Sequence, residues 1–177
     1  SENMTGMGHG RGQIQTVTLG GTKDGDLLAY RIEIIQDAGG YPNMGAILPY
    51  ATRIMASGVY DIPAVQVSSH SVATNTTPTG AYRGAGRPEA SAALERAVDL
   101  FADEAGLDPA DVRRRNFVRP DAFPFTTPTG TTYDSGDYEG SLDRALAAAG
   151  YEELLAEQAQ RRADGDPRLL GIGIATY

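Results

Sequence analysis

Residues 80–117 read GAYRGAGRPEASAALERAVDLFADEAGLDPADVRRRNF, in which a glycine-rich turn leads into a helical pattern. Apolar residues recur every three or four positions between Ala90 and Phe101, which is the spacing of one helix face. Pro88 suits the first helical position, where a missing N–H costs nothing, and Gly106 suits the C-terminal cap. We therefore predict a long amphipathic helix that begins at or next to Pro88.

Three further helices are predicted after this one. Asp108 is the expected N-cap of the first, with Pro109 in its first turn and Asp111 completing a box-like D-x-x-D pattern. Residues 139–166 hold two more helical patterns that are interrupted near Gly150. The C-terminal half is thus predicted to be mainly helical.

The N-terminal part of the chain has strand patterns instead. Residues 13–20 alternate between apolar and polar side chains, and residues 27–36 form a longer strand pattern after the turn signal Asp24-Gly25. Residues 63–73 alternate in the same way. Asp37 precedes two glycines and is expected to form a turn.

Three segments complete the prediction. Residues 42–58 have helical spacing, although Pro49 must occupy the first turn or kink the helix. Residues 119–138 contain three prolines and few aliphatic side chains, which indicates a loop. We predict an α+β fold with helices on one face of a mixed sheet, whose strands lie near 13–20, 27–36, 63–73 and 169–177.

The composition excludes several classes of protein. Fifteen Lys and Arg against 23 Asp and Glu leave a net charge of −8, which argues against a nucleic-acid partner. With no cysteine, the chain has no disulfide, no thiolate metal site and no iron–sulfur ligands of its own. It has neither an apolar run of about 20 residues nor a signal-peptide pattern, so we expect no membrane span and a cytoplasmic location.

Both ends of the chain indicate a piece of a larger protein. The strand pattern of residues 169–177 runs into the last residue, and the first residues carry no start or capping signal. Strands that lose their neighbours leave exposed edges and apolar patches. We therefore expect that the isolated chain self-associates.

The turn before the long helix has the chemistry of an anion site. Gly84, Ala85 and Gly86 precede a helix N-terminus, where unpaired N–H groups attract an oxyanion, and Arg83 adds a cation with paired donors. The stretch lacks the third glycine of a dinucleotide-binding loop and the lysine of a P-loop. From the residues alone, an anion site and a plain turn into a helix stay equally open.

Other chemistry-bearing residues favour structural roles. His9 and His70 are the only histidines, and a pair this sparse favours surface or hydrogen-bonding positions over metal ligation. Glu89 and Glu95 on the long helix, and the run Arg113–Arg115, are typical of solvated helix faces.

With these motifs the chain resembles the large, molybdenum-binding subunit of the xanthine oxidase and carbon monoxide dehydrogenase family. The resemblance covers nearly the whole chain, and residues 80–117 are its most specific part. The other matching motifs follow in order: GHGRGQ (8–13), DAGGY (37–41), YDIPAVQVSSHSVATNTTPTGAYRGAGR (60–87), YDSGDY (133–138) and GIGIATY (171–177).

The resemblance implies a molybdopterin cofactor, in bacteria often in its cytosine dinucleotide form, that the protein holds without ligating the metal itself. It implies that Arg83, Gly84 and Ala85 line the cofactor site, that Tyr82 packs beneath it, and that Ala85 borders the substrate pocket. Its implied partners are the rest of the large subunit, iron–sulfur and FAD subunits or domains, and a small-molecule substrate.

Departures from the family pattern narrow the expected metal site and substrate. Gly84 stands where copper-containing carbon monoxide dehydrogenases carry a cysteine, which excludes a molybdenum–copper site. Ala85 stands where purine and aldehyde oxidisers carry an aromatic residue, which weakens the case for a purine substrate. The family's catalytic glutamate would lie beyond Tyr177, and its metal-contacting glutamine upstream of Ser1. No catalytic residue is therefore expected here, and the isolated chain should be inactive and hold no molybdenum.

The expected organisation is one fragment of a molybdopterin-binding domain over residues 1–177. Its parts are mainly strands (1–80), the cofactor loop with helices (81–118), a loop (119–138), and helices with a truncated strand (139–177). Two alternatives stay open beside a central fragment of a molybdenum hydroxylase. One is a stand-alone anion- or nucleotide-binding module, which a cytidine nucleotide would protect against heat. The other is a structural interaction domain in which the loop is only a turn.

Overall fold

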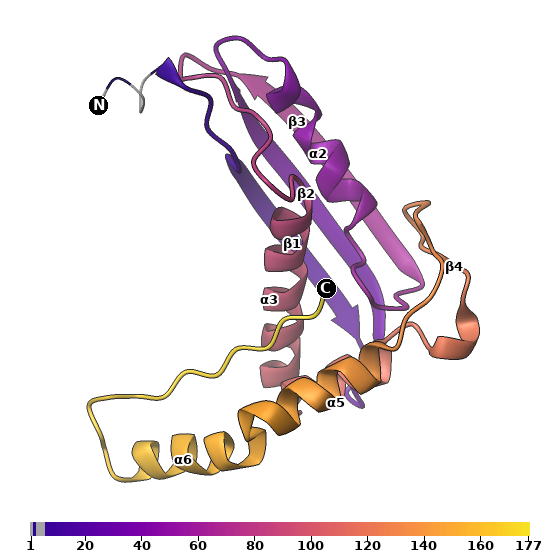
Figure 1. The fold of residues 1–177 in the computed structure, drawn as a ribbon, viewed down its shortest axis with the longest axis vertical. Coiled ribbons are helices and arrows are strands. Elements are labelled where there is room, and N and C mark those ends of the chain that lie inside the picture. The colour runs from indigo at the N-terminus through magenta and orange to yellow at the C-terminus, as the bar shows by residue number, and fades with distance from the viewer. Residues whose placement is uncertain (1, 3–5) are drawn as a thin grey trace.

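A three-stranded mixed sheet forms the N-terminal half of the protein (Figure 1). β1 (Gln13–Gly21) pairs antiparallel with β2 (Leu27–Gly39), and β2 pairs parallel with β3 (Ala64–Ala73), so β2 is the central strand. The structure, a computed structural model, describes Glu2 and residues 6–177. The three strands predicted in this half are confirmed, and so is the α+β class.

One face of the sheet is covered by helices and the other is open. Along β2 the side chains of Tyr30, Ile32 and Ile34 are buried, while the intervening Arg31 and Glu33 are exposed. This alternation is what the two-residue period of a strand produces when only one face is covered.

The covering helices are α2 (Met44–Ile54) and α3 (Arg87–Ala105). Gln13 Nε2 on β1 donates to Thr52 Oγ1 of α2, and Gln15 Nε2 donates to the Glu89 carbonyl of α3. Because Gln13 and Gln15 are two positions apart on one strand, both helices lie over the same face. Figure 1 shows α3 beside β1 and α2 along β2 and β3.

The helix α2 contains its proline in an interior position. Pro49 lies one turn beyond the start of the helix at Met44, not in its first turn. Proline has no N–H, so the Gly45 carbonyl receives no helical hydrogen bond from it. A side chain at Gly45 would collide with Thr79. This glycine therefore lets α2 pack closely against Thr79, which directly precedes the glycine-rich turn.

The helix boundaries after residue 86 agree with the predicted caps. Gly106 ends α3 in the left-handed conformation, with φ of 69°. Asp108 caps α4 (Pro109–Asn116) by accepting from the Ala110 and Asp111 N–H groups. The break at Gly150 separates α5 (Tyr138–Ala149) from α6 (Tyr151–Ala163), as expected.

The segment predicted as a loop, residues 119–138, contains short regular elements. It holds a 3-10 turn, η1 (Pro120–Ala122), and a two-residue hairpin of β4 (Phe125–Thr126) and β5 (Thr132–Tyr133). The hairpin forms because Thr127 N–H donates to the Thr131 carbonyl around a glycine with positive φ, a local bond that composition alone does not reveal.

The predicted strand at residues 169–177 is wrong. This segment has no strand pairing and returns from the end of α6 toward α3 (Figure 1). Its backbone is bonded to side chains: Arg113 donates to the Ile174 carbonyl at 2.8 Å, and Gln158 donates to the Leu170 carbonyl at 2.9 Å. An apolar alternation predicts an extended segment, but a strand also needs a neighbouring backbone, which the chain does not supply here.

The core lies between the sheet, α3 and the segment after α2. Its buried side chains include Ile32, Tyr60, Leu94 and Val98, and Tyr60 stacks on Phe117 with ring centroids 5.6 Å apart. Within Glu2 and residues 6–177, no helix combines the length and apolar character needed to cross a bilayer.

Candidate functional site

The Arg83 loop (residues 80–86) is a tight turn that runs into α3. Ala85 N–H donates to the Tyr82 carbonyl at 2.8 Å, and Arg87 N–H donates to the Gly84 carbonyl at 3.0 Å. Gly84 and Gly86 have φ of 92° and 88°, a region that costs other residues strain. The loop conformation therefore depends on both glycines.

The two glycines of the loop have different surroundings. A β-carbon on Gly86 would collide with the backbone and side chain of Ala51 in α2. A β-carbon on Gly84 would meet only the ring of Pro88, at 3.1 and 3.2 Å. Gly86 thus lets the loop pack on α2, whereas Gly84 keeps one side of the loop bare and exposed.

The N-terminus of α3 is satisfied in part by the protein itself. The buried Glu89 carboxylate accepts from Gly86 N–H at 2.8 Å, and Pro88, at the second helical position, has no N–H to offer. A carboxylate in the first turn also neutralises the positive end of the helix dipole. The interpretation of Glu89 as a solvated acid is therefore wrong, and an anion at this helix end would compete with its carboxylate.

The side chain and amide of Arg83 remain available. The guanidinium is exposed, and within the described part of the chain no carboxylate or other group pairs with it. The N–H groups of Arg83 and Gly84 likewise donate to no other described residue. An unpaired cation beside unpaired amides on bare backbone is suited to an anionic ligand with oxygen acceptors.

The approach to the loop is held by a second polar cluster. The Asp37 carboxylate accepts from Thr74 Oγ1 at 2.7 Å, Gly39 N–H at 2.9 Å and Thr76 Oγ1 at 3.0 Å. Thr79 Oγ1 donates to the backbone carbonyl of Asp37 at 2.7 Å. The three bonds to the carboxylate, that of Thr74 first, hold the pKa of the Asp37 carboxyl below its usual value. The predicted turn-former is thus also the attachment point for the chain that enters the Arg83 loop.

Glu95 and Arg113, which were expected to be solvated, form a buried network elsewhere. Arg113 is fully buried, and its guanidinium pairs with Glu95 and Asp99, each at 2.9 Å. Tyr60 OH donates to Glu95 Oε1 at 2.7 Å, and Thr176 N–H donates to Glu95 Oε2 at 3.1 Å. The prediction of one solvated face is wrong for Arg113 and Glu95, because these residues join α3 and α4 to the C-terminal segment.

The histidines lie in different parts of the fold. His9 forms an isolated parallel bridge with Thr79, and His70 lies exposed on β3 opposite Ile35. Among the described residues, no three His, Cys, Asp or Glu side chains gather closely enough to hold a metal ion.

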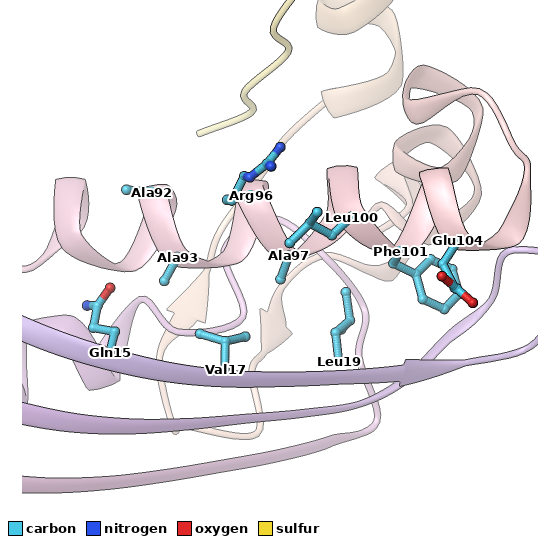
Figure 2. A pocket seen from close by; sticks show the side chains of 10 residues that line it. All are labelled: Gln15, Val17, Leu19, Ala92, Ala93, Arg96, Ala97, Leu100, Phe101 and Glu104. Atoms are coloured by element: carbon cyan, nitrogen blue, oxygen red, sulfur yellow. The ribbon is translucent and has the colours of Figure 1, made fainter.

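A groove of about 520 Å³ lies between β1 and α3 (Figure 2). Val17 and Leu19 point toward Ala93 and Ala97 across it, and Figure 2 shows the Arg96 guanidinium on the far side of α3. None of the lining residues belongs to the Arg83 loop, and no set of polar groups converges in the groove. We therefore place the candidate site at the loop.

Comparison with known proteins identifies the family of the whole chain. Residues 1–117 match the model of the molybdopterin cofactor-binding domain. The chain belongs to this family. The carbon monoxide dehydrogenase large chain of Hydrogenophaga pseudoflava is 38% identical over 181 residues, which cover 99% of this chain and 22% of that protein. The 6-hydroxypseudooxynicotine dehydrogenase complex subunit gamma of Paenarthrobacter nicotinovorans is 35% identical, covering 98% and 22%.

Solved structures agree with the sequence relatives. Quinoline 2-oxidoreductase from Pseudomonas putida 86 superposes with a TM-score of 0.86 and 35% identity, over 93% of this chain and 21% of that one. The chain thus spans about a fifth of the length of these molybdopterin-domain relatives.

The structure brings together residues that sequence reasoning had separated. Glu89 and Asp37 both support the Arg83 loop, from α3 and from the end of β2. The spacing Gly86-x-x-Glu89 is that of a capping box and was the available signal for Glu89. No local signal pairs Asp37 with Thr74, because the contact joins residues 37 positions apart.

Proposed function

We propose that the Arg83 loop contacts the anionic, metal-bearing end of molybdopterin in the large subunit of a molybdenum-dependent oxidoreductase. The observation that carries this proposal is the unpaired Arg83 guanidinium beside the free amides of Arg83 and Gly84, in a chain of the molybdopterin cofactor-binding family. Since the chain spans only about a fifth of the length of its relatives, the activity would belong to a protein of their length.

The residues of the loop fit such a group. Arg83 would donate to anionic oxygen atoms through a rigid pair of N–H groups, and Gly84 would let the ligand approach the main chain. Ala85 would border the substrate pocket, while Tyr82 would support the loop from beneath. When bound, the molybdenum–pterin group supplies the redox chemistry that hydroxylates a substrate. The loop itself would contribute binding and electrostatic stabilisation.

The substrate class follows from what the loop omits. Gly84 carries no sulfur and cannot hold copper, which separates this protein from a copper-dependent reaction with carbon monoxide. Ala85 leaves more room than an aromatic residue would. A small organic molecule such as an N-heterocycle or aldehyde is therefore favoured, and the relative named for quinoline supports this choice.

The remaining assignments extend this proposal. The cofactor would be the cytosine dinucleotide form, and the partners would be the rest of the large subunit with iron–sulfur and FAD modules, in the cytoplasm. Residues 1–177 would be one piece of the molybdopterin-binding domain. The open edges of β1 and β3, and the exposed Ile14 and Ile35 on the uncovered face, support self-association of the isolated chain.

The test uses the full-length protein produced in a host that makes molybdenum cofactor. Arg83→Met should lower the molybdenum and pterin that co-purify through gel filtration, and Arg83→Lys should restore them in part because it keeps the charge without the paired donors. Arg31→Met is the matched control, since Arg31 is exposed on the uncovered sheet face. Unchanged metal and pterin content in Arg83→Met would contradict the proposal. The 177-residue chain alone should retain no molybdenum.

A further inference from the structure

A short N-terminal segment, residues 8–12, lies along the Arg83 loop. His9 N–H donates to the Pro78 carbonyl at 3.2 Å, and Gly80 N–H donates to the His9 carbonyl at 2.6 Å. These bonds form an isolated parallel bridge of His9 with Thr79. The segment is thereby fixed in register with the chain that enters the loop.

Arg11 in this segment reaches two parts of the loop with one side chain. Its guanidinium carbon lies 4.7 Å from the centroid of the Tyr82 ring, and its Nη2 donates to the Arg83 carbonyl at 2.8 Å. A cation at this distance from an aromatic face is attracted by the negative face of the ring. The same group thus holds both the side chain of Tyr82 and the backbone of the next residue.

The backbone around Arg11 is shaped for this contact. Arg11 has φ of 62°, a left-handed conformation that is uncommon for a residue with a side chain. A β-carbon on the preceding Gly10 would lie 2.8 Å from the β-carbon of Tyr82. The close approach of the two segments therefore requires Gly10. The left-handed backbone of Arg11 directs its own side chain onto the Tyr82 ring.

We propose that Arg11 is a positioning residue that clamps Tyr82 and the Arg83 carbonyl, so that the Arg83 guanidinium and the neighbouring amides face outward as a fixed set of donors. The clamp is a property of the chain alone. Its consequence for a ligand rests on the proposed function. The Arg11 guanidinium donates a hydrogen bond to a carbonyl and lies over an aromatic ring, whereas the Arg83 guanidinium has neither contact among the described residues.

A single fluorophore can report the clamp. The chain contains no tryptophan, so Tyr82→Trp places the only indole under the Arg11 guanidinium, where a cation–π contact is at least as favourable as with tyrosine. In this background Arg11→Met should lower the emission anisotropy and shift the emission spectrum, and Arg11→Lys should restore part of both because it keeps a cation near the ring. Arg31→Met, an exposed position of β2 on the uncovered sheet face, should change neither the anisotropy nor the spectrum.

Hydrogen exchange supplies a second readout that needs no new fluorophore. Ala85 and Arg87 donate hydrogen bonds inside the loop, so in Arg11→Met their amides should exchange about threefold to tenfold faster, while amides of β2 keep their rates. Unchanged anisotropy and exchange in Arg11→Met would overturn the clamp. Faster exchange throughout β2 would overturn it too, because it would show general destabilisation.

The two proposals fail separately. If Arg11→Met loosens the loop but no form of the full-length protein retains molybdenum or pterin, the clamp stands and the cofactor role of the loop fails. If the full-length protein retains the cofactor and Arg11→Met leaves the loop unchanged, the cofactor role stands and the clamp fails.

Discussion

Arg113 and Arg83 lie in one fold with opposite surroundings. Arg113 is fully buried and bonds to Glu95, Asp99 and the carbonyls of Pro109 and Ile174. Arg83 is exposed, and no described residue pairs with its guanidinium. All partners of Arg113 come from the chain itself, whereas the Arg83 guanidinium has no partner among the described residues.

This difference separates a charge that holds the fold together from a charge that the fold does not use. A buried guanidinium is tolerated only when its donors and charge are matched, so Arg113 specifies how α3, α4 and the C-terminal segment meet. An exposed guanidinium held on a constrained loop contributes little to stability and keeps its binding capacity. If the difference holds, substitutions can disturb either site without disturbing the other.

The largest effect is expected from Arg113→Met. Removing this guanidinium leaves the Glu95 carboxylate buried without its cation, which should lower the free energy of unfolding by about 3–5 kcal/mol. Urea unfolding followed by circular dichroism measures it. Arg115→Met is the control, because Arg115 pairs with Asp26 at the surface and its loss should cost far less. Equal losses in the two variants would remove the distinction between buried and exposed arginines.

Substitution of Gly86 should cost more stability than substitution of Gly84, as at the buried and exposed arginines. Gly86→Ala combines a positive φ with a collision against Ala51, and should lower the free energy of unfolding by about 3 kcal/mol. Gly84→Ala has a similar φ but meets only Pro88, so about 1 kcal/mol is expected. The same urea titration measures both. A larger loss in Gly84→Ala would show that the exposed side of the loop is the structural one.

Alkaline pH should weaken the buried network. Burial, and then the nearby Glu95 carboxylate, raise the pKa of Tyr60 well above its ordinary value. Unfolded tyrosine loses its proton near pH 10 while folded Tyr60 keeps it, so the stabilisation is complete below that pH and is lost as pH rises. Between pH 9 and pH 11 the free energy of unfolding should fall by about 1.4 kcal/mol through Tyr60. Tyr60→Phe should flatten this dependence by that amount, and an unchanged slope would contradict the assignment.

The smallest effect on stability is expected from Arg83→Met. Because no described residue pairs with this side chain, the free energy of unfolding should stay within about 0.5 kcal/mol of wild type. Thermal and urea unfolding of the 177-residue chain measure it. A loss comparable to that of Arg113→Met would mean that Arg83 is structural, and it would remove the basis for its role as a ligand contact.

Local patterns predicted most of the elements. The turn at Asp24-Gly25, the cap at Asp108 and the break at Gly150 are short-range signals, and each lies where it was expected. The α+β class followed from alternation in one half and helical spacing in the other. The strand at 169–177 failed because pairing depends on a second segment, which no pattern within the strand reports.

The site was predicted in part. Tyr82, Arg83, Gly84 and Ala85 were selected from the motif and its resemblance, and their contacts with a cofactor stay a prediction. The support of the loop by Arg11, Glu89 and Asp37 was missed, as was the burial of Glu95 and Arg113. Apart from Glu89, which has capping-box spacing, each of these acids and arginines has the same local sequence pattern as a solvated residue, since charge patterns do not show which surface is later covered.

By itself, the sequence determined most of the secondary structure, the class of fold and the motif that identifies the molybdopterin cofactor-binding family, because propensities, caps and turns act within a few residues. Only the tertiary structure decided which charges are used up inside the protein. Arg113 lies within α4 and Arg83 lies just before α3, and what distinguishes them is packing between segments up to 61 residues apart. A buried charge requires a partner within the chain, whereas an exposed charge is solvated and requires none.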